Sequence, residues 1–212
     1  MSIKVPADRT AIVLIEPQND FLSPGGTMYT YIKDQLEKRN VIANLKNLLD
    51  QARGKVKIFY VPFHPFEKGF PELKEGGPGR EGLRGIEIDM EADWGTGAWL
   101  KGTPGPEIVD ELKPQPGDII VEGKKTLDAF HSTALDYLLR ANEIEYVAFA
   151  GFHTNWCVES SARSAYDKAY RVIVLSDCTG TDTQEEQDYA EKYIFPRIGR
   201  VMTSKEFLEA LA

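Results

Sequence analysis

Short apolar segments alternate along the chain with longer segments in which apolar residues recur every three or four positions. The short segments are rich in Val, Ile, Tyr and Phe, and their hydrophobicity is nearly continuous, which is typical of strands covered on both faces of a parallel sheet. These segments are 11–15, 56–61, 118–121, 146–150, 172–175 and 200–202. We therefore predict about six strands, most of them parallel.

The longer segments have the spacing of amphipathic helices. The clearest is Val41–Ala52, in which the apolar residues of successive turns form one stripe. The others are 133–140, 157–169, 184–194 and 205–211. This alternation predicts right-handed crossovers and a three-layer α/β/α domain with helices on both faces of the sheet. In such domains, ligands bind beyond the carboxyl ends of the strands.

One segment interrupts the alternation. Residues 63–116 hold much of the Gly and Pro of the chain, together with Trp94 and Trp99. A long irregular segment in a compact domain is usually functional or disordered, and the tryptophans favour order. We interpret residues 63–103 as a lid or pocket wall within a single domain that spans residues 1–212. The alternative is a loop that packs only on the domain surface or on a second subunit.

Charge and composition narrow the function classes. The chain has 212 residues, a formal net charge of −8 and no cluster of Lys and Arg, which argues against binding to nucleic acid or to an anionic membrane surface. The first residues lack the apolar core of a signal peptide, and no segment approaches the roughly 20 apolar residues of a membrane span. We therefore expect a cytoplasmic protein whose two cysteines, Cys157 and Cys178, stay reduced.

Three predicted strands are followed by residues that can do chemistry. Asp20, Lys124 and Cys157 come after the first, third and fourth strands, and Cys157 opens a helix. A helix N-terminus and a nearby ammonium group favour the thiolate form of a cysteine. A carboxylate can accept the thiol proton and return it to a leaving amine. The three side chains would suffice for acyl transfer without a metal or an organic cofactor.

Each of these residues also has a purely structural interpretation. Cysteine is among the residue types most often buried, Asp20 could cap a turn, and Lys124 could be solvated. Their shared position at one edge of the sheet does not by itself decide between the two interpretations.

Three motifs make the chain resemble the isochorismatase-like cysteine hydrolases. AIVLIEPQNDF resembles the first strand of that family and the Q-x-D-F turn after it, and KKTLDAF resembles its Lys six residues before a Phe. GFHTNWCVESSARSAYDKAYRVIVLSDCT resembles the nucleophile segment, G-x-x-T-x-x-C-V. The resemblance covers nearly the whole chain and is weakest over residues 63–100. It implies about six parallel strands with helices on both faces.

The resemblance implies a catalytic triad of Asp20, Lys124 and Cys157. Lys124 has the family spacing, and Lys125 is the alternative, since neighbouring residues at a strand end point in opposite directions. The acidic residue before the Q-x-D-F turn is Glu16 instead of the usual Asp. We expect little chemical consequence from that difference.

The family often has a non-proline cis peptide bond before the nucleophile, here between Phe152 and His153. Such a bond would aim the N–H groups of His153 and Cys157 at a developing oxyanion. Arg80 and Arg84 could bind a substrate carboxylate or could be solvated. We also expect six side chains to contact the substrate, namely Phe21, His64, Trp94, Trp99, Phe152 and Trp156.

The metal ligands of some relatives are incomplete in this sequence. Nicotinamidases of the superfamily carry Asp-x-His and a further His after the second strand. Here His64 is present, but Pro62 stands in place of the Asp and no second His follows. One His does not make a metal site, so we predict neither a metal nor another cofactor.

The resemblance implies a hydrolase that cleaves a C–N bond of a small amide or of a ureido or carbamoyl compound. The reaction would pass through a thioester and release ammonia or an amine. The stretch TNWCVESSAR is most similar to the ureidoacrylate and biuret hydrolases. The alternatives are isochorismatase-type cleavage of a vinyl ether, which needs no thiol, and a catalytically silent binding protein. The family also implies a homodimer or a homotetramer.

Overall fold

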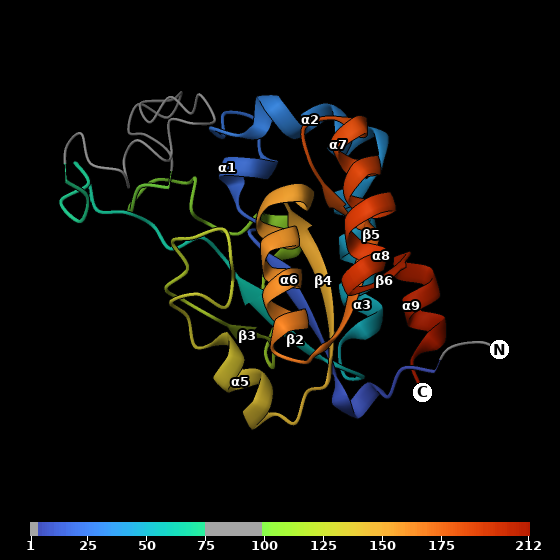
Figure 1. Cartoon of the computed structure of the whole chain (residues 1–212). Helices are drawn as coiled ribbons and strands as arrows, with labels where there is room; N and C mark the ends of the chain where they lie inside the picture. Colours follow the sequence, from blue (N-terminus) through green and yellow to red (C-terminus); the bar gives the residue numbers. More distant parts are fainter. Residues whose placement is uncertain (1–3, 75–98) are drawn as a thin grey trace.

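The computed structural model describes residues 4–74 and 99–212. Six parallel strands form one sheet in the order β3-β2-β1-β4-β5-β6 (Figure 1). The strands are β1 (Thr10–Ile15), β2 (Lys57–Val61), β3 (Ile119–Ile120), β4 (Tyr146–Phe152), β5 (Arg171–Gly180) and β6 (Gly199–Met202). The predicted parallel α/β sheet is confirmed.

Helices connect the strands. The α-helices are α1 (Asn19–Leu22), α2 (Tyr29–Lys38), α3 (Val41–Ala52), α5 (Leu135–Ala141), α6 (Glu159–Asp167), α7 (Gln184–Tyr189), α8 (Phe195–Ile198) and α9 (Ser204–Ala210). Two π-helical turns, η3 (Thr154–Val158) and η4 (Ala190–Ile194), and two 3₁₀ turns, η1 (Ala7–Arg9) and η2 (Asp110–Leu112), complete the described elements.

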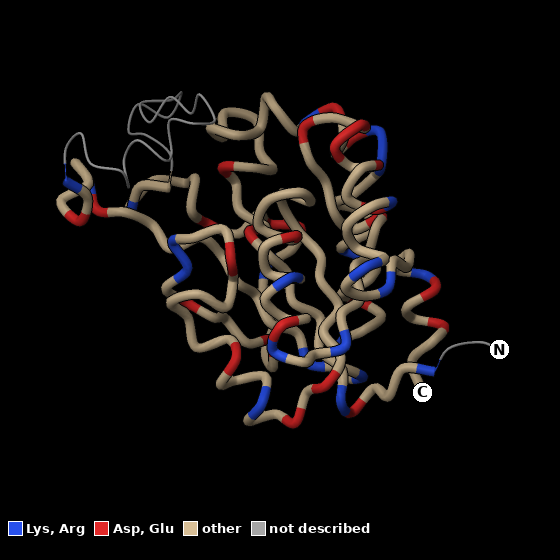
Figure 2. The backbone as a smooth tube through the Cα atoms, in the orientation of Figure 1, with Lys and Arg blue, Asp and Glu red and all other residues tan. Residues whose placement is uncertain are grey.

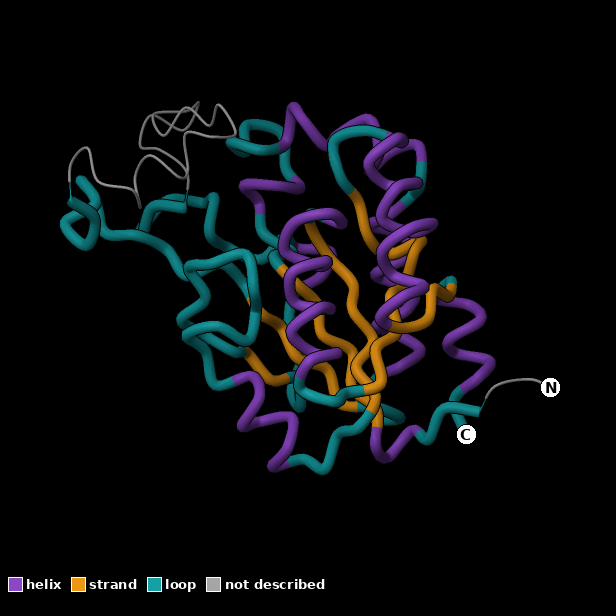
Figure 3. Tube along the Cα trace, in the orientation of Figure 1, coloured by secondary structure: helices purple, strands orange, loops and turns teal. Residues whose placement is uncertain are grey.

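The helices cover both faces of the sheet (Figure 3). Along β1, Ile12 and Leu14 pack into one apolar cluster with buried residues of α2, α3 and α9. Val13 and Ile15 point the other way, into a second cluster with α5, α6 and α8. Every residue of β1 is buried, because alternate side chains of a central strand enter the two cores in turn.

The predicted helices agree with the observed ones, except that those over 157–169 and 184–194 are each divided and that α1, α2 and α8 were not predicted. The predicted helix over 157–169 begins earlier and is divided, because η3 holds the cysteine and α6 follows it. Helix α2 was not predicted. It buries only Ile32, Gln35 and Leu36, so its apolar stripe is too short to stand out in the sequence.

The described ends of the long irregular segment are joined to each other. The backbone N–H of Phe66 donates to the carbonyl of Trp99 at 2.7 Å, and the N–H of Lys101 donates to the carbonyl of Phe66 at 2.9 Å. The rings of Phe63 and Trp99 lie 4.9 Å apart in the apolar core. Trp94, Arg80 and Arg84 lie outside the described residues, so the lid and those contacts stay predictions.

Acidic and basic residues are interspersed around the described backbone (Figure 2). Within residues 4–74 and 99–212, no helix combines the length and the apolar character needed to cross a membrane.

Gly151 sets a steric limit where β1 and β4 meet. Its φ is 116°, and an added Cβ would overlap the carbonyl oxygen of Ile15 on the neighbouring strand. We expect Gly151→Ala to lower the free energy of unfolding by about 3 kcal/mol, from overpacking and backbone strain together. Gly54 is the matched control, because its φ is 78° but its Cβ position is open. Gly54→Ala should cost only about 1 kcal/mol. Equal losses in urea unfolding would contradict the steric explanation.

Candidate active site

Two charged side chains meet beyond the carboxyl ends of the strands. Glu16 is the first residue after β1, and Lys124 follows β3. The ammonium of Lys124 donates to Oε1 of Glu16, and both side chains are almost fully inaccessible, at 0% and 1% exposure. A buried charge is stable only when it is paired, so each of these groups depends on the other.

The thiol of Cys157 completes this cluster. Cys157 lies in η3, between β4 and α6, and is a free, buried cysteine. Its side chain makes hydrogen bonds with both Glu16 and Lys124. The structure therefore brings together a thiol, a carboxylate and an ammonium group.

The surroundings of the thiol raise its pKa above the usual value for a cysteine. Burial raises the pKa of Cys157, the charge of Glu16 raises it further, and the ammonium of Lys124 only partly opposes this. The expected lowering of the thiol pKa is therefore wrong for the free enzyme, because burial outweighs the favourable charges. Burial also disfavours the ammonium of Lys124, but Glu16 and Cys157 outweigh it and raise the pKa of Lys124.

Asp20 faces a different environment from the one predicted. Its carboxylate accepts the backbone N–H of Trp99 at 2.9 Å and the hydroxyl of Thr27 at 3.2 Å. It also lies against Gly105, where an added Cβ would overlap the carboxylate. Burial raises the pKa of Asp20, while these hydrogen bonds oppose the rise. In the described structure, Asp20 joins the loop after β1 to the ends of the irregular segment, and Glu16 stands beside the thiol.

The position along the chain explains this difference. Glu16 directly follows the last residue of β1, at the level of the sheet edge, whereas Asp20 lies four residues later, within α1. The sequence feature that identifies Glu16 is therefore its position directly after the last residue of the strand.

Lys125 points away from the thiol. Its ammonium lies 3.9 Å from the ring centroid of Phe66 and 3.2 Å from Oε1 of Glu72. The structure thus places Lys124, and not its neighbour, in contact with Cys157.

The loop before the nucleophile has the expected backbone. The Phe152–His153 peptide bond is cis. The backbone N–H of His153 hydrogen-bonds to the sulfur of Cys157 and acts to lower the thiol pKa. This N–H therefore points toward the sulfur of Cys157.

The predicted substrate-contacting residues divide into four groups, of which His64 is the last. Phe21, Trp99 and Trp156 lie near one another, since the ring of His153 contacts Phe21 at 5.2 Å and Trp156 at 5.1 Å, and Phe21 contacts Trp99 at 5.7 Å. Phe152 is fully buried in the apolar core below α2. Trp94 lies outside the described residues.

His64 lies apart from the thiol cluster. It is exposed and lines a surface cleft of about 330 Å³ with Pro62 and Glu122, while its backbone N–H donates to the carbonyl of Lys124 at 2.6 Å. Among the described residues, no three His, Cys, Asp or Glu side chains converge as a metal site would require.

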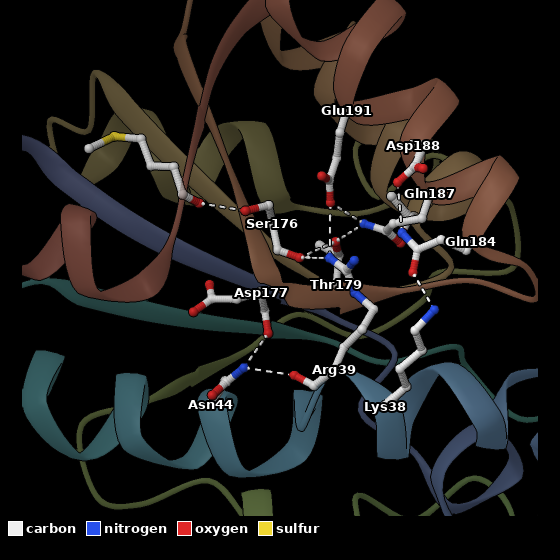
Figure 4. A network of polar contacts seen from close by, with 12 residues as sticks. Lys38, Arg39, Asn44, Ser176, Asp177, Thr179, Gln184, Gln187, Asp188 and Glu191 are labelled. Atoms are coloured by element: carbon white, nitrogen blue, oxygen red, sulfur yellow. Dashed lines mark hydrogen bonds and ion pairs between the residues drawn. The ribbon is translucent and has the colours of Figure 1, made fainter.

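A chain of polar contacts runs from Arg39 through Glu191 to Gln187 (Figure 4), and Gln187 in turn contacts η3. The side chain of Gln187 accepts the hydroxyl of Thr154 at 2.7 Å, and it donates to Glu191 at 2.6 Å and to Thr179 at 3.1 Å. Arg39, at the end of α2, donates to the same oxygen of Glu191 at 3.0 Å. Because Thr154 is the first residue of η3, this chain fixes the turn that carries the thiol.

We expect Gln187→Met to lower the free energy of unfolding by about 2 kcal/mol, because it leaves buried polar partners unsatisfied. The turnover number should fall with it, since η3 loses a support. Gln184→Met is the matched control on the same helix, because Gln184 bonds only to exposed residues. It should change stability by less than about 0.5 kcal/mol. Thermal unfolding of both variants tests this, and an equal effect would contradict the supporting role.

Three comparisons with known proteins agree with this geometry. Residues 10–206 match the isochorismatase domain family. The ureidoacrylate amidohydrolase RutB of Rhizobium rhizogenes is 35% identical over 184 residues, which cover 84% of this chain and 72% of that protein. An N-carbamoylsarcosine amidase structure from Thermoplasma acidophilum is 25% identical with a TM-score of 0.68, covering 92% of this chain and 96% of that chain. A cysteine hydrolase structure from Pseudomonas syringae pv. phaseolicola shares the fold, with a TM-score of 0.80 at 24% identity and coverage of 97% and 93%. The chain belongs to the isochorismatase family of hydrolases.

Proposed function

We propose that this protein is a cysteine hydrolase that cleaves a C–N bond in a small amide or in a ureido or carbamoyl compound. The observation that carries the proposal is the contact of one buried thiol with both a carboxylate and an ammonium group. We assign the nucleophile to Cys157, the proton transfer to Glu16 and the charge stabilisation to Lys124. Asp20 is replaced by Glu16 in the triad that the sequence suggested.

The first half-reaction forms a thioester. The sulfur of Cys157 attacks the carbonyl carbon as its proton passes to Glu16, and the ammonium of Lys124 stabilises the charge on both partners. The backbone N–H groups of His153 and Cys157 donate to the oxyanion of the tetrahedral intermediate. The C–N bond then breaks, and Glu16 returns the proton to the departing nitrogen, which leaves as ammonia or an amine.

The second half-reaction restores the thiol. A water molecule attacks the thioester carbonyl and gives one proton to Glu16. The C–S bond breaks, the sulfur of Cys157 recovers that proton, and a carboxylic or carbamic acid leaves. Every proton is exchanged between substrate, water and Glu16, so the cycle needs no redox partner.

The relatives narrow the substrate class. The Rhizobium relative is named for a ureidoacrylate, and the Thermoplasma protein is named for an N-carbamoyl amino acid. Both of these named compounds contain a ureido group. We propose a ureido or carbamoyl substrate on this basis.

The experiment is ammonia release from a panel of carboxamides, ureido compounds and N-carbamoyl amines. We expect ammonia from at least one ureido compound, and none above background from Cys157→Ala. If the unmodified protein and Cys157→Ala both hydrolyse isochorismate, and neither releases ammonia from the panel, the proposal is contradicted and vinyl-ether cleavage is favoured.

A further inference from the structure

Two buried polar side chains next to the nucleophile loop have no hydrogen-bond partner among the described residues. They are the indole Nε1 of Trp99 and the imidazole of His153, whose residues are 4% and 1% exposed. Both rings contact the ring of Phe21. Leaving such groups unsatisfied costs stability, so two unsatisfied groups that both contact Phe21 favour a ligand that supplies their missing partners.

Asp182 favours one tautomer of the His153 imidazole and so decides which of its nitrogens can accept a hydrogen bond. Its Oδ1 lies 3.1 Å from Nδ1 of His153, close enough for an electrostatic contact but not aligned for a hydrogen bond. A carboxylate beside Nδ1 favours the tautomer that carries its proton there. In that tautomer Nε2 presents a lone pair, so it accepts a hydrogen bond and does not donate one.

The aromatic neighbours hold the imidazole in place. Trp156 stacks on His153 with an interplanar angle of 21°, and Phe21 meets it edge to face at 65°. The backbone N–H of the same residue faces the sulfur of Cys157. The main chain of His153 therefore faces the thiol, while its side chain lies between two aromatic rings.

We propose that His153 and Trp99 form a subsite for a second amide or ureido group, at the end of the substrate that does not react. This deepens the proposed function and depends on it. The indole N–H of Trp99 donates to the carbonyl oxygen of that group, and Nε2 of His153 accepts one of its N–H groups. An alkyl end satisfies neither atom, and a carboxylate end satisfies only Trp99.

Three ureas with the same reacting group test this subsite. N-carbamoylglycinamide ends in an amide, N-carbamoylglycine ends in a carboxylate, and propylurea ends in an alkyl group. We expect the unmodified protein to hydrolyse the amide-ended compound with a kcat/KM about tenfold or more above that of propylurea, the effect of one to two hydrogen bonds.

Two variants remove one partner each and keep an aromatic ring. In Trp99→Phe and His153→Phe, the preference for the amide end over the alkyl end should fall by about tenfold, mainly through KM. His153→Gln, which regains an acceptor oxygen, should recover part of the preference. Tyr137→Phe is the control on an exposed aromatic ring and should leave all three rates unchanged.

The outcomes separate this subsite from the reaction itself. Equal kcat/KM for the amide and alkyl ends in the unmodified protein would overturn the subsite and leave the proposed function standing. Ammonia release from other compounds of the panel, but from none of these three ureas, would also overturn the subsite and leave the proposed function standing. A preference for the carboxylate end that both variants abolish would also overturn the amide assignment. No ammonia from any compound would contradict the proposed function as well.

Discussion

Cys157→Ala is expected to lower kcat/KM for the best substrate of the panel by about 10³-fold or more, because no other group in the site can form the thioester. The fold should persist, since the substitution removes only one sulfur atom from a packed position. Ammonia release measures the first effect, and circular dichroism during heating measures the second.

Cys178→Ala is the matched control for this experiment. Cys178 is also free and buried, but it packs in the core on the other side of the sheet. It should lose a similar amount of stability and retain turnover. Retention of activity in Cys157→Ala, or its loss in both variants, would contradict the assignment of the nucleophile.

Lys124→Met is expected to lower the free energy of unfolding by roughly 3–5 kcal/mol and to abolish turnover. The reason is that Glu16 would remain buried without its counter-charge, and breaking a buried pair from one side costs about that much. Urea unfolding followed by fluorescence measures the loss.

A double variant shows whether the pair is the cause. Lys124→Met combined with Glu16→Gln removes both charges and should recover a large part of the lost stability, although not the activity. Lys125→Met is the neighbouring control, because Lys125 is half-buried and pairs with an exposed carboxylate. It should cost less than about 1 kcal/mol. A double variant no more stable than Lys124→Met would contradict the coupling.

The sequence predicts the inner strands of the sheet well because they are largely buried on both faces. β1 is the clearest case, since all six of its residues are apolar or small and all are buried. The sequence predicts α2 poorly, because this helix turns only two apolar side chains and Gln35 into the core. What decides such a helix is tertiary packing, which the local pattern does not contain.

The site is predicted in part for a related reason. Lys124 and Cys157 can be predicted as site residues from their positions after β3 and β4, and their side chains contact each other in the structure. The choice between Glu16 and Asp20 depends on which carboxylate faces the thiol, and that depends on the path of the loop after β1. In this loop the Gln18 side chain bonds to both the N–H and the carbonyl of Phe63, at 2.7 and 2.9 Å. A contact across 45 residues of sequence cannot be inferred from a local motif.

The hydrogen bonds that connect η3 to Gln187 could not be predicted from the sequence either. Thr154 and Gln187 stand 33 residues apart, and neither residue type suggests a partner. His153 and Asp182 are a similar case, since they meet only because the segments after β4 and β5 lie side by side.

The most direct test of the account is the ratio of kcat/KM between Glu16→Gln and Asp20→Asn on one ureido substrate. Glu16→Gln removes the group that takes and returns the thiol proton, so its kcat/KM should fall by about 10²–10⁴-fold. Asp20→Asn keeps an oxygen that can accept the N–H of Trp99, and it should stay within about tenfold of the unmodified protein. We therefore expect a ratio well below one. An active Glu16→Gln beside an inactive Asp20→Asn would contradict it and return the catalytic role to Asp20.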